Sequence, residues 1–245
     1  MGRLTGTLPV AGRALPRLTG LDAGPWELGE IDVLHVNHEI GYQGSLDLIP
    51  PAVNPSIPPH VSWLAYQVPD SDLGPFRLVQ TRVGCRVGLK PRGLVVGCVC
   101  DNPEVAERLT NGWGFPVRSG SVRLSRRADR IELTVEVDGA AVLELDLLGP
   151  NVLAGAGVPI APGLNLAESP RGRQLVQVDP EYVIHSADRG TPRVRSFDAG
   201  AWGEPTIRPS WPISGTLLRA EVMLPALRFL IDPQLPPDEG TTRLP

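Results

Sequence analysis

The chain has very little lysine, histidine and cysteine. Its 245 residues include a single lysine, Lys90, within a total of 23 basic residues, together with four histidines and three cysteines. Covalent chemistry through an amine is therefore limited to Lys90 or to the N-terminal amino group. Cys85, Cys98 and Cys100 are too few and too closely spaced for a disulfide framework in a chain of this size, so we expect a cytoplasmic protein.

Long apolar runs and blocks of like charge are also missing. No apolar stretch approaches the ~18 residues that a membrane span needs. The N-terminus does not show the basic start, apolar run and cleavage site of a secretory signal. The net charge is −4 and the basic residues are scattered along the chain. We therefore expect neither a membrane nor a nucleic acid as a partner.

Glycine and proline, by contrast, are abundant, with 27 of each. They punctuate residues 1–24 so closely that we expect an extended N-terminal arm, followed by a single domain at 25–235 and a polar tail at 236–245. Apolar residues within the domain predict strands at 31–36, 61–67, 77–89, 94–100, 131–137, 143–147, 174–184 and 193–197. The segment 216–224 fits a strand or a helix, and a short helix is expected after Pro225. This pattern predicts a mainly β fold, or an α+β fold with few helices.

One helix is well delimited. Asp101 or Asn102 offers an N-cap, Pro103 suits the first helical position and Asn111-Gly112 supplies a left-handed stop, which predicts a helix at about 103–110. The two strands before it form a hairpin, and the residue types at 90–93 favour the turn there, with Lys90 at its tip. A second hairpin is expected to turn at Asp138-Gly139.

This order of elements resembles the acetoacetate decarboxylase superfamily. The resemblance is most specific at Trp113-Gly114-Phe115-Pro116-Val117-Arg118, is supported by Glu221-Val222-Met223-Leu224-Pro225, and covers about residues 28–233. It implies a single domain in which a strongly curved, largely antiparallel sheet encloses a central cavity. It also implies assembly into a homo-oligomer.

The same resemblance shows that the family's usual chemistry is missing. In those decarboxylases two adjacent lysines follow the glycine-aromatic-proline turn, and the first forms a Schiff base with a keto acid. The matching positions here are Val117 and Arg118, and valine cannot form an imine. Counting back without a gap places Leu78 and Trp63 where the family has acidic residues. We therefore expect an enzyme that acts without a lysine Schiff base.

The predicted site combines an apolar cavity with a few polar groups. The positions matched to the family place Trp63, Leu78, Val99, Phe115 and Val117 around the cavity, with Arg118 beside them. Alternation along the strands adds three polar side chains: Gln67 on the face of Trp63, and Gln80 and Arg82 on the face of Leu78. We expect Arg118 and Gln80 to be catalytic, polarising a substrate carbonyl, and the other seven to bind the substrate. Core packing is the alternative for Trp63 and Leu78, and a salt bridge that supports the turn is the alternative for Arg118.

Such a site favours positioning over covalent catalysis. We expect a cyclase or isomerase, including a pericyclic one, that acts on a carbonyl-bearing, polyketide-like small molecule in secondary metabolism. A lyase of the decarboxylase or aldolase-dehydratase type with relocated acid-base residues, or a non-catalytic ligand-binding protein, remains possible. No cofactor is expected. His35, His38 and Glu39 can be read as metal ligands, but without a paired motif we expect no metal site. The thiols of Cys98 and Cys100 are expected to point away from the cavity, because they share a strand face opposite Val99.

Overall fold

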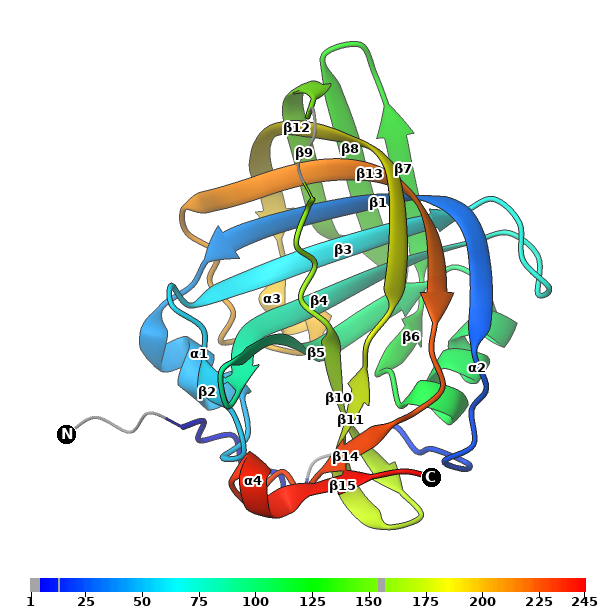
Figure 1. The fold of residues 1–245 in the computed structure, drawn as a ribbon. Coiled ribbons are helices and arrows are strands. Elements are labelled where there is room, and N and C mark those ends of the chain that lie inside the picture. The colour runs from blue at the N-terminus through cyan, green and yellow to red at the C-terminus, as the bar shows by residue number, and fades with distance from the viewer. Residues whose placement is uncertain (1–4, 13, 154–156) are drawn as a thin grey trace.

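The protein is organised around one large, strongly curved sheet (Figure 1). The structure, a computed structural model, describes residues 5–12, 14–153 and 157–245. Fifteen strands are found in this part of the chain: β1 (Trp26–Glu39), β2 (Asn54–Pro55), β3 (His60–Val68), β4 (Phe76–Val87), β5 (Lys90–Cys100), β6 (Val117–Ser119), β7 (Ser121–Arg126), β8 (Arg130–Val137), β9 (Ala140–Val152), β10 (Gly163–Ser169), β11 (Gly172–Val178), β12 (Glu181–Phe197), β13 (Pro212–Leu224), β14 (Phe229–Ile231) and β15 (Thr241–Arg243). The helices are α1 (Tyr42–Leu48), α2 (Pro103–Trp113), α3 (Ala199–Trp202) and α4 (Pro237–Gly240). The predicted mainly β class is confirmed.

Strands that are distant in the sequence become neighbours in this sheet. The main path runs β15-β14-β11-β10-β5-β4-β3-β1-β13-β12-β9-β8-β7. All of its pairings are antiparallel except β10 with β5, and β6 also joins β5 in parallel. The long strands β1, β3, β4 and β13 lie side by side across the middle of the molecule, while β10, β11, β14 and β15 gather at the end that holds the C-terminus (Figure 1).

The sheet buries apolar side chains on both of its faces. One core contains Leu109 and Trp113 of α2, and we call the sheet surface that packs against it the α2 face. The other core contains Ala199 and Trp202 of α3, and we call that surface the α3 face. Each central strand alternates between the two cores, because successive side chains point to opposite sides of a strand. Any site on this sheet therefore belongs to one face or the other.

Helix α2 begins as predicted and ends later. The Asn102 side chain caps it by accepting hydrogen bonds from the backbone amides of Glu104 and Val105. The helix continues through Asn111 and Gly112 to Trp113, and its left-handed cap is Gly114, with φ of 70°. The expected stop was therefore three residues too early, because Trp113 packs its side chain into the α2-face core and this burial extends the helix.

Other boundaries also differ from the prediction. The first hairpin turns at Gly88-Leu89, with Gly88 at a φ of 59°, and Lys90 is the first residue of β5. The segment 174–184 divides between β11 and β12, β10 and α1 were not foreseen, and the segment after Pro225 forms β14 rather than a helix. The second hairpin turns at Asp138-Gly139 as predicted, with both residues at positive φ. No helix in the described ranges is long and apolar enough to cross a membrane.

The N-terminal arm packs against its own domain. Leu8, Val10 and Leu18 are buried. The backbone amide of Leu8 donates to the carbonyl of Ile49, and Arg17 forms an isolated bridge with Glu168. The described part of this segment therefore adds apolar side chains to both cores, and its separation from the domain as an extended arm stays a prediction.

Candidate functional site

The candidate site lies on the α2 face of the sheet. Every second side chain of the neighbouring strands β3, β4 and β5 points to this face. Strand β4 contributes Leu78, Gln80 and Arg82, and the neighbouring strand places Tyr66 opposite Leu78. All four side chains are buried. Gln80 and Arg82 share the face of Leu78, as the alternation predicted, and that face is lined by polar groups deep inside an otherwise apolar core.

Arg82 is the centre of this polar group. It is only 2% exposed. Its Nε and Nη2 donate to Oε1 of Gln80 at 2.8 and 2.5 Å, its Nη1 donates to the carbonyl of Ala161 at 2.9 Å, and its Nη2 also approaches the Tyr66 hydroxyl at 3.4 Å. The Tyr66 hydroxyl in turn lies 2.8 Å from that of Tyr182 on β12. These hydrogen bonds fix the guanidinium in one orientation.

No carboxylate among the described residues balances the positive charge of Arg82. The three groups that accept its hydrogen bonds are an amide, a backbone carbonyl and a phenol, all of them uncharged. None of the ion pairs found among the described residues includes it. A buried cation without a counter-ion is costly, since desolvation is not offset by an opposite charge. The position therefore favours a ligand with an anionic or electron-rich oxygen.

Glycines make the room that Arg82 occupies. A Cβ on Gly93, which pairs with Gly84 in the β4-β5 hairpin, would lie 3.0 Å from Cδ of Arg82, and a Cβ on Gly163 of β10 would lie 3.9 Å from its Cζ. A side chain at Gly93 would push the arginine stem aside. The guanidinium is therefore held by its hydrogen-bond partners and by the shape of the backbone around it.

Three ionisable groups near Arg82, those of His35, Tyr182 and Cys98, are neutral at physiological pH. Burial, reinforced by Arg82 and His60, lowers the pKa of His35 to about 4. Burial and the neighbouring Tyr66 raise the pKa of Tyr182 well above its usual value. Burial also raises the pKa of the Cys98 thiol. Since a general acid or base works best with a pKa near the working pH, these three groups are poorly suited to proton transfer and well suited to fixed hydrogen bonding.

The cavity beside Gln80 is small. It has a volume of about 20 Å³ and is lined by Trp26, Leu28, Tyr66, Phe76, Leu78, Gln80, Leu109, Pro180, Val222 and Leu224. This is enough for about one water molecule. The enclosed cavity expected from the resemblance is therefore nearly filled by apolar side chains, and a substrate needs either a movement of these side chains or the use of an adjoining pocket.

A larger pocket lies near the start of β3, at the opposite end of this strand from the small cavity. It has a volume of about 350 Å³ and is lined by His35, Asn37, Ile57, Pro58, His60, Ser62, Pro91, Pro159, Ile160, Ala161, Pro162 and Ile213. Ser62 faces Arg82 across the β3-β4 pairing, and Ala161 supplies the carbonyl that Arg82 binds. The pocket therefore reaches the Arg82 cluster from the side opposite the small cavity.

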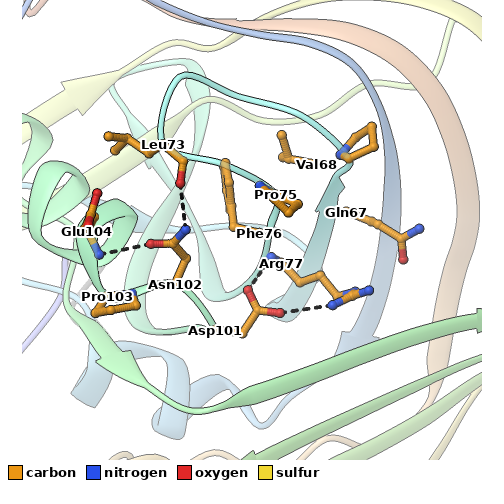
Figure 2. Close-up of a pocket in the computed structure, with 11 residues that line it drawn as sticks. Gln67, Val68, Leu73, Pro75, Phe76, Arg77, Asp101, Asn102, Pro103 and Glu104 are labelled. Atoms are coloured by element: carbon orange, nitrogen blue, oxygen red, sulfur yellow. Dashed lines mark hydrogen bonds and ion pairs between the residues drawn. The ribbon is translucent and has the colours of Figure 1, made fainter.

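Gln67 lies outside the Arg82 cluster. It lines an open hollow of about 680 Å³ between β3, β4 and the start of α2, together with Arg77 and Asp101 (Figure 2). The Arg77 guanidinium forms an ion pair with Oδ2 of Asp101 at 3.2 Å, and the Arg77 backbone amide donates to Oδ1 of Asp101 at 2.6 Å. The prediction that Gln67 shares the face of Trp63 agrees with the alternation, but that face does not carry Leu78 and Gln80.

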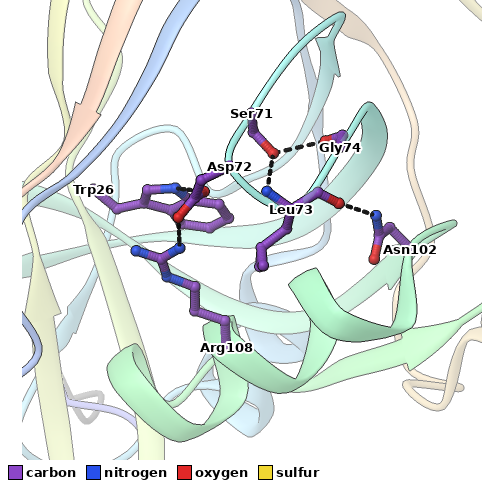
Figure 3. Close-up of polar contacts among 7 residues, drawn as sticks. All are labelled: Trp26, Ser71, Asp72, Leu73, Gly74, Asn102 and Arg108. Carbon is purple, nitrogen blue, oxygen red and sulfur yellow. Dashed lines mark hydrogen bonds and ion pairs between the residues drawn. The ribbon is translucent and has the colours of Figure 1, made fainter.

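The loop between β3 and β4 is tied to α2 and to Trp26, a residue that lines the small cavity (Figure 3). Asp72 accepts a hydrogen bond from Nε1 of Trp26 at 2.8 Å and one from Nη1 of Arg108 at 2.5 Å. The Arg108 guanidinium lies 4.2 Å above the Trp26 ring, and the Asn102 side chain holds the loop through the carbonyl of Leu73. Arg108 and Trp26 hold the pKa of Asp72 below its usual value. The loop thus fixes Trp26 as a wall of the cavity.

Trp63 and Val99 are on the opposite side of the sheet. Both belong to the α3-face core, whereas Leu78 and Phe115 belong to the α2-face core. Trp63 packs edge-on against Phe197, with ring centroids 5.3 Å apart. The prediction that Trp63, Val99 and Leu78 line one cavity is therefore wrong, because an ungapped count from Val117 places β3 and β5 one residue out of phase. For the same reason Cys98 and Cys100 share the face of Leu78 instead of pointing away from it.

The stretch at 113–118 also divides between the faces. Phe115 is fully buried on the α2 face, and the half-buried Val117 packs against the same core. The exposed Arg118 turns the other way and donates to the carbonyls of Ala201 and Trp202 at 2.9 and 2.8 Å. It therefore caps the end of α3 and lies away from Gln80. The buried charge of the site is Arg82. Arg118 is not placed for the predicted catalytic role, and none of the ion pairs found among the described residues is the salt bridge that was its alternative.

The remaining candidates from the sequence do not form sites. Lys90 is exposed on the first hairpin, away from the Arg82 cluster. His38 packs against Trp63 at a ring distance of 5.7 Å, whereas His35 lines the pocket near Arg82, so the two histidines do not converge. Within the described ranges no group of three or more potential metal ligands is found.

Sequence reasoning missed Tyr66, Tyr182 and His35 as members of the site. Alternation along β3 carries a signal for Tyr66, since it lies on the strand face that excludes Trp63. Tyr182 has no local signal, because it comes from a strand 116 residues away in the sequence. His35 faces the site only because β1 pairs with β3, which places it opposite Leu64.

Comparison with solved structures decides the fold. An acetoacetate decarboxylase superposes with a TM-score of 0.73 over 91% of this chain and 93% of its own, at 15% sequence identity. The chain has the acetoacetate decarboxylase fold. The enzyme from Legionella pneumophila gives a TM-score of 0.70 at 16% identity, over 91% of this chain and 93% of its own. The enduracididine biosynthesis enzyme MppR, with HEPES buffer bound, gives 0.72 at 17% identity, over 91% of this chain and 97% of its own. No family model and no curated protein matches the sequence.

Proposed function

We propose that the protein is a biosynthetic enzyme that acts on a carbonyl-bearing small molecule without a lysine Schiff base. The observation that carries this proposal is the buried Arg82, held by Gln80 and Tyr66 and lacking a carboxylate partner. A substrate carbonyl at this position would accept hydrogen bonds from groups that are already oriented. Polarisation of the carbonyl lowers the barrier to addition at a conjugated alkene and needs no nucleophile from the protein.

The reaction class that fits best is cyclisation or isomerisation, including a pericyclic closure, of a polyketide-like substrate in secondary metabolism. In such a closure new bonds form between carbons of the same molecule, and no atom is lost or gained. The enzyme contributes position and a fixed positive charge. The shifted pKa values of His35, Tyr182 and Cys98 support this class over a lyase with relocated acid-base residues, since none of these groups titrates near neutral pH.

Structural neighbours give further support. One structure of MppR is described as a complex with pyruvate, and another as a complex with the condensation product of pyruvate and imidazole 4-carboxaldehyde. The same fold therefore accommodates carbonyl compounds in a biosynthetic enzyme. We further propose that Val117 occupies the position of the family's Schiff-base lysine. With the single lysine, Lys90, on the exposed hairpin, the chemistry here would then be different. Assembly into a homo-oligomer stays a prediction.

The decisive experiment follows the mass of the product. Deletion of the gene in its host should cause a pathway intermediate to accumulate, and purified protein should convert that intermediate into a product of the same molecular formula, followed by liquid chromatography and mass spectrometry. Loss of carbon dioxide or water would instead establish a lyase. An unchanged intermediate together with normal product levels in the deletion strain would contradict an enzymatic role.

Substitutions test whether catalysis depends on the charge of the Arg82 cluster. Gln80→Glu would give Arg82 a carboxylate partner, and we expect kcat/KM to fall by about 10²-fold or more, because a neutralised guanidinium polarises a carbonyl less. Arg118→Ala is the matched control, since its guanidinium lies on α3, and it should retain most of the activity. Borohydride treatment in the presence of pyruvate should leave Lys90 unmodified, and an adduct at Lys90 would overturn the proposed chemistry.

A further inference from the structure

The pocket beside the Arg82 cluster has the size and composition of a small-molecule site. Its volume of about 350 Å³ lies within the range usual for ligand pockets. Most of its wall is apolar, formed by Ile57, Ile160, Ile213 and prolines that include Pro58 and Pro162. Ile57 and Ile213 are 81% and 41% exposed. Exposed isoleucines around a concave surface are favourable for contact with an apolar body.

The inner side of the pocket is polar, and a chain of two hydrogen bonds runs along it from Ser62 through Asn37 to Ser214. Ser62 donates to Oδ1 of Asn37 at 2.5 Å, and Nδ2 of Asn37 donates to the Ser214 hydroxyl at 2.9 Å. His35 stands beside this chain and is only 7% exposed. Asn37 is thus locked by its two neighbours, and the pocket's inner side is rigid.

A buried positive charge, that of Arg82, adjoins the inner side of the pocket. Arg82 lies directly behind the inner side, since it binds the carbonyl of Ala161 and faces Ser62 across the strand pairing. Among the described residues that line the pocket none is Asp or Glu, and two are histidines, His35 and His60. His35 and His60 line the pocket together with Ser62, the residue opposite Arg82, and both Arg82 and His60 help to lower the pKa of His35. The field of a buried cation is weakly screened at such a site.

We propose that this pocket binds an apolar monocarboxylate, with the carboxylate directed to the inner side near His35 and the apolar body against Ile160 and Ile213. The bound anion would provide the negative charge that Arg82 lacks, and the apolar body would cover the exposed isoleucines. This inference extends the proposed function by naming a chemical class for its substrate or product. It concerns binding alone, so it can fail or succeed independently of catalysis.

The test compares a charged probe with a neutral probe of the same shape. Isothermal titration calorimetry of the purified protein with 2-naphthoate should show binding, whereas 2-acetylnaphthalene should bind at least about five-fold more weakly. The variants Ile213→Glu and Ile213→Gln differ only in charge at a partly exposed position, so both should fold. Ile213→Glu should weaken 2-naphthoate binding about three- to ten-fold relative to Ile213→Gln and leave the neutral probe unaffected.

Val183→Glu is the remote control, because Val183 is exposed on β12 and is not among the residues that line this pocket. It should leave the affinity for 2-naphthoate unchanged. Absence of binding, equal binding of the two probes, or equal affinities of Ile213→Glu and Ile213→Gln would each overturn the inference. Binding of 2-naphthoate without turnover of any substrate would support the binding pocket and contradict the proposed enzymatic function. Turnover with a KM that is insensitive to Ile213→Glu would support the enzymatic function and contradict the binding pocket.

Discussion

At the scale of single residues, Arg82 defines the site more clearly than any other side chain. It is buried, fixed by Gln80 at 2.5 and 2.8 Å, and surrounded by groups that carry no negative charge. His35 stays neutral because burial and the nearby guanidinium both oppose its protonation. Arg82 therefore supplies a permanent positive charge while His35 stays neutral, so the interior attracts electron-rich oxygen without offering a readily transferred proton at neutral pH.

The low pKa of His35 makes the stability of the protein depend on pH. Its pKa is about 4 in the folded protein against 6.5 for the free side chain, so between these values the unfolded chain binds more protons. The free energy of unfolding should therefore fall as the pH drops from 6.5 to 4, by about 3 kcal/mol from this residue, and His38 shifts in the same direction. Urea unfolding at a series of pH values measures the slope.

His35→Gln should flatten that slope, whatever its effect at pH 7. His185→Gln is the control, because His185 lies on the surface beside Glu221, and it should keep the fall in stability. An equally steep slope in both variants would show that His35 is protonated without penalty in the folded state.

At the scale of elements, the helix α2 and the turn that follows it determine how the site is enclosed. Gly114 ends the helix in a left-handed conformation, and a Cβ there would lie 2.7 Å from Cβ of Ala167 and 3.0 Å from Cδ1 of Leu18. Both φ and the close packing require glycine. Gly112 lies within α2, one residue before its last residue, Trp113. A Cβ added to Gly112 would contact only Cβ of Ala23, at 3.4 Å.

Gly114→Ala should destabilise the protein by about 1–3 kcal/mol, because it combines backbone strain with a steric clash. Gly112→Ala should be neutral or stabilising by up to about 1 kcal/mol, since alanine is the better helix former. Chemical denaturation of both variants checks the contrast. A loss of stability at Gly112→Ala equal to that at Gly114→Ala would mean that the helix ends where the sequence alone suggests.

At the scale of the whole molecule, the site depends on contacts across the curved sheet. The hydroxyls of Tyr66 and Tyr182 meet at 2.8 Å although β3 and β12 are separated in the sheet by β1 and β13. Curvature brings these strands together over the α2 face. Tyr182 thereby extends the hydrogen-bonded network of Arg82 to the far side of the interior.

A double-mutant cycle measures this contact. Tyr182→Phe and Tyr66→Phe should each reduce the free energy of unfolding by about 0.5–1.5 kcal/mol, and the double variant should lose less than the sum, because each single variant leaves the other hydroxyl partly unsatisfied. Additive losses would indicate that the two hydroxyls do not interact in solution.

The sequence by itself determined the fold class, the start of α2, the second hairpin and the presence of Gln80 and Arg82 on one strand face. These features depend on local chemistry: alternation, capping residues and turn glycines act over a few positions. That residue 117 is a valine is read directly from the sequence, whereas its match to the family's lysine stays a prediction.

Only the tertiary structure decided which strand faces meet. The pairing registers place Leu78 opposite Tyr66 rather than Trp63, and direct Arg118 to α3 instead of the interior. A shift of one residue moves every side chain of a strand to the other face, so an ungapped count along the chain cannot resolve it. The assembly of Arg82, Gln80, Tyr66 and Tyr182 results from sheet curvature and long-range pairing, which bring together residues that have no pattern in common in the sequence.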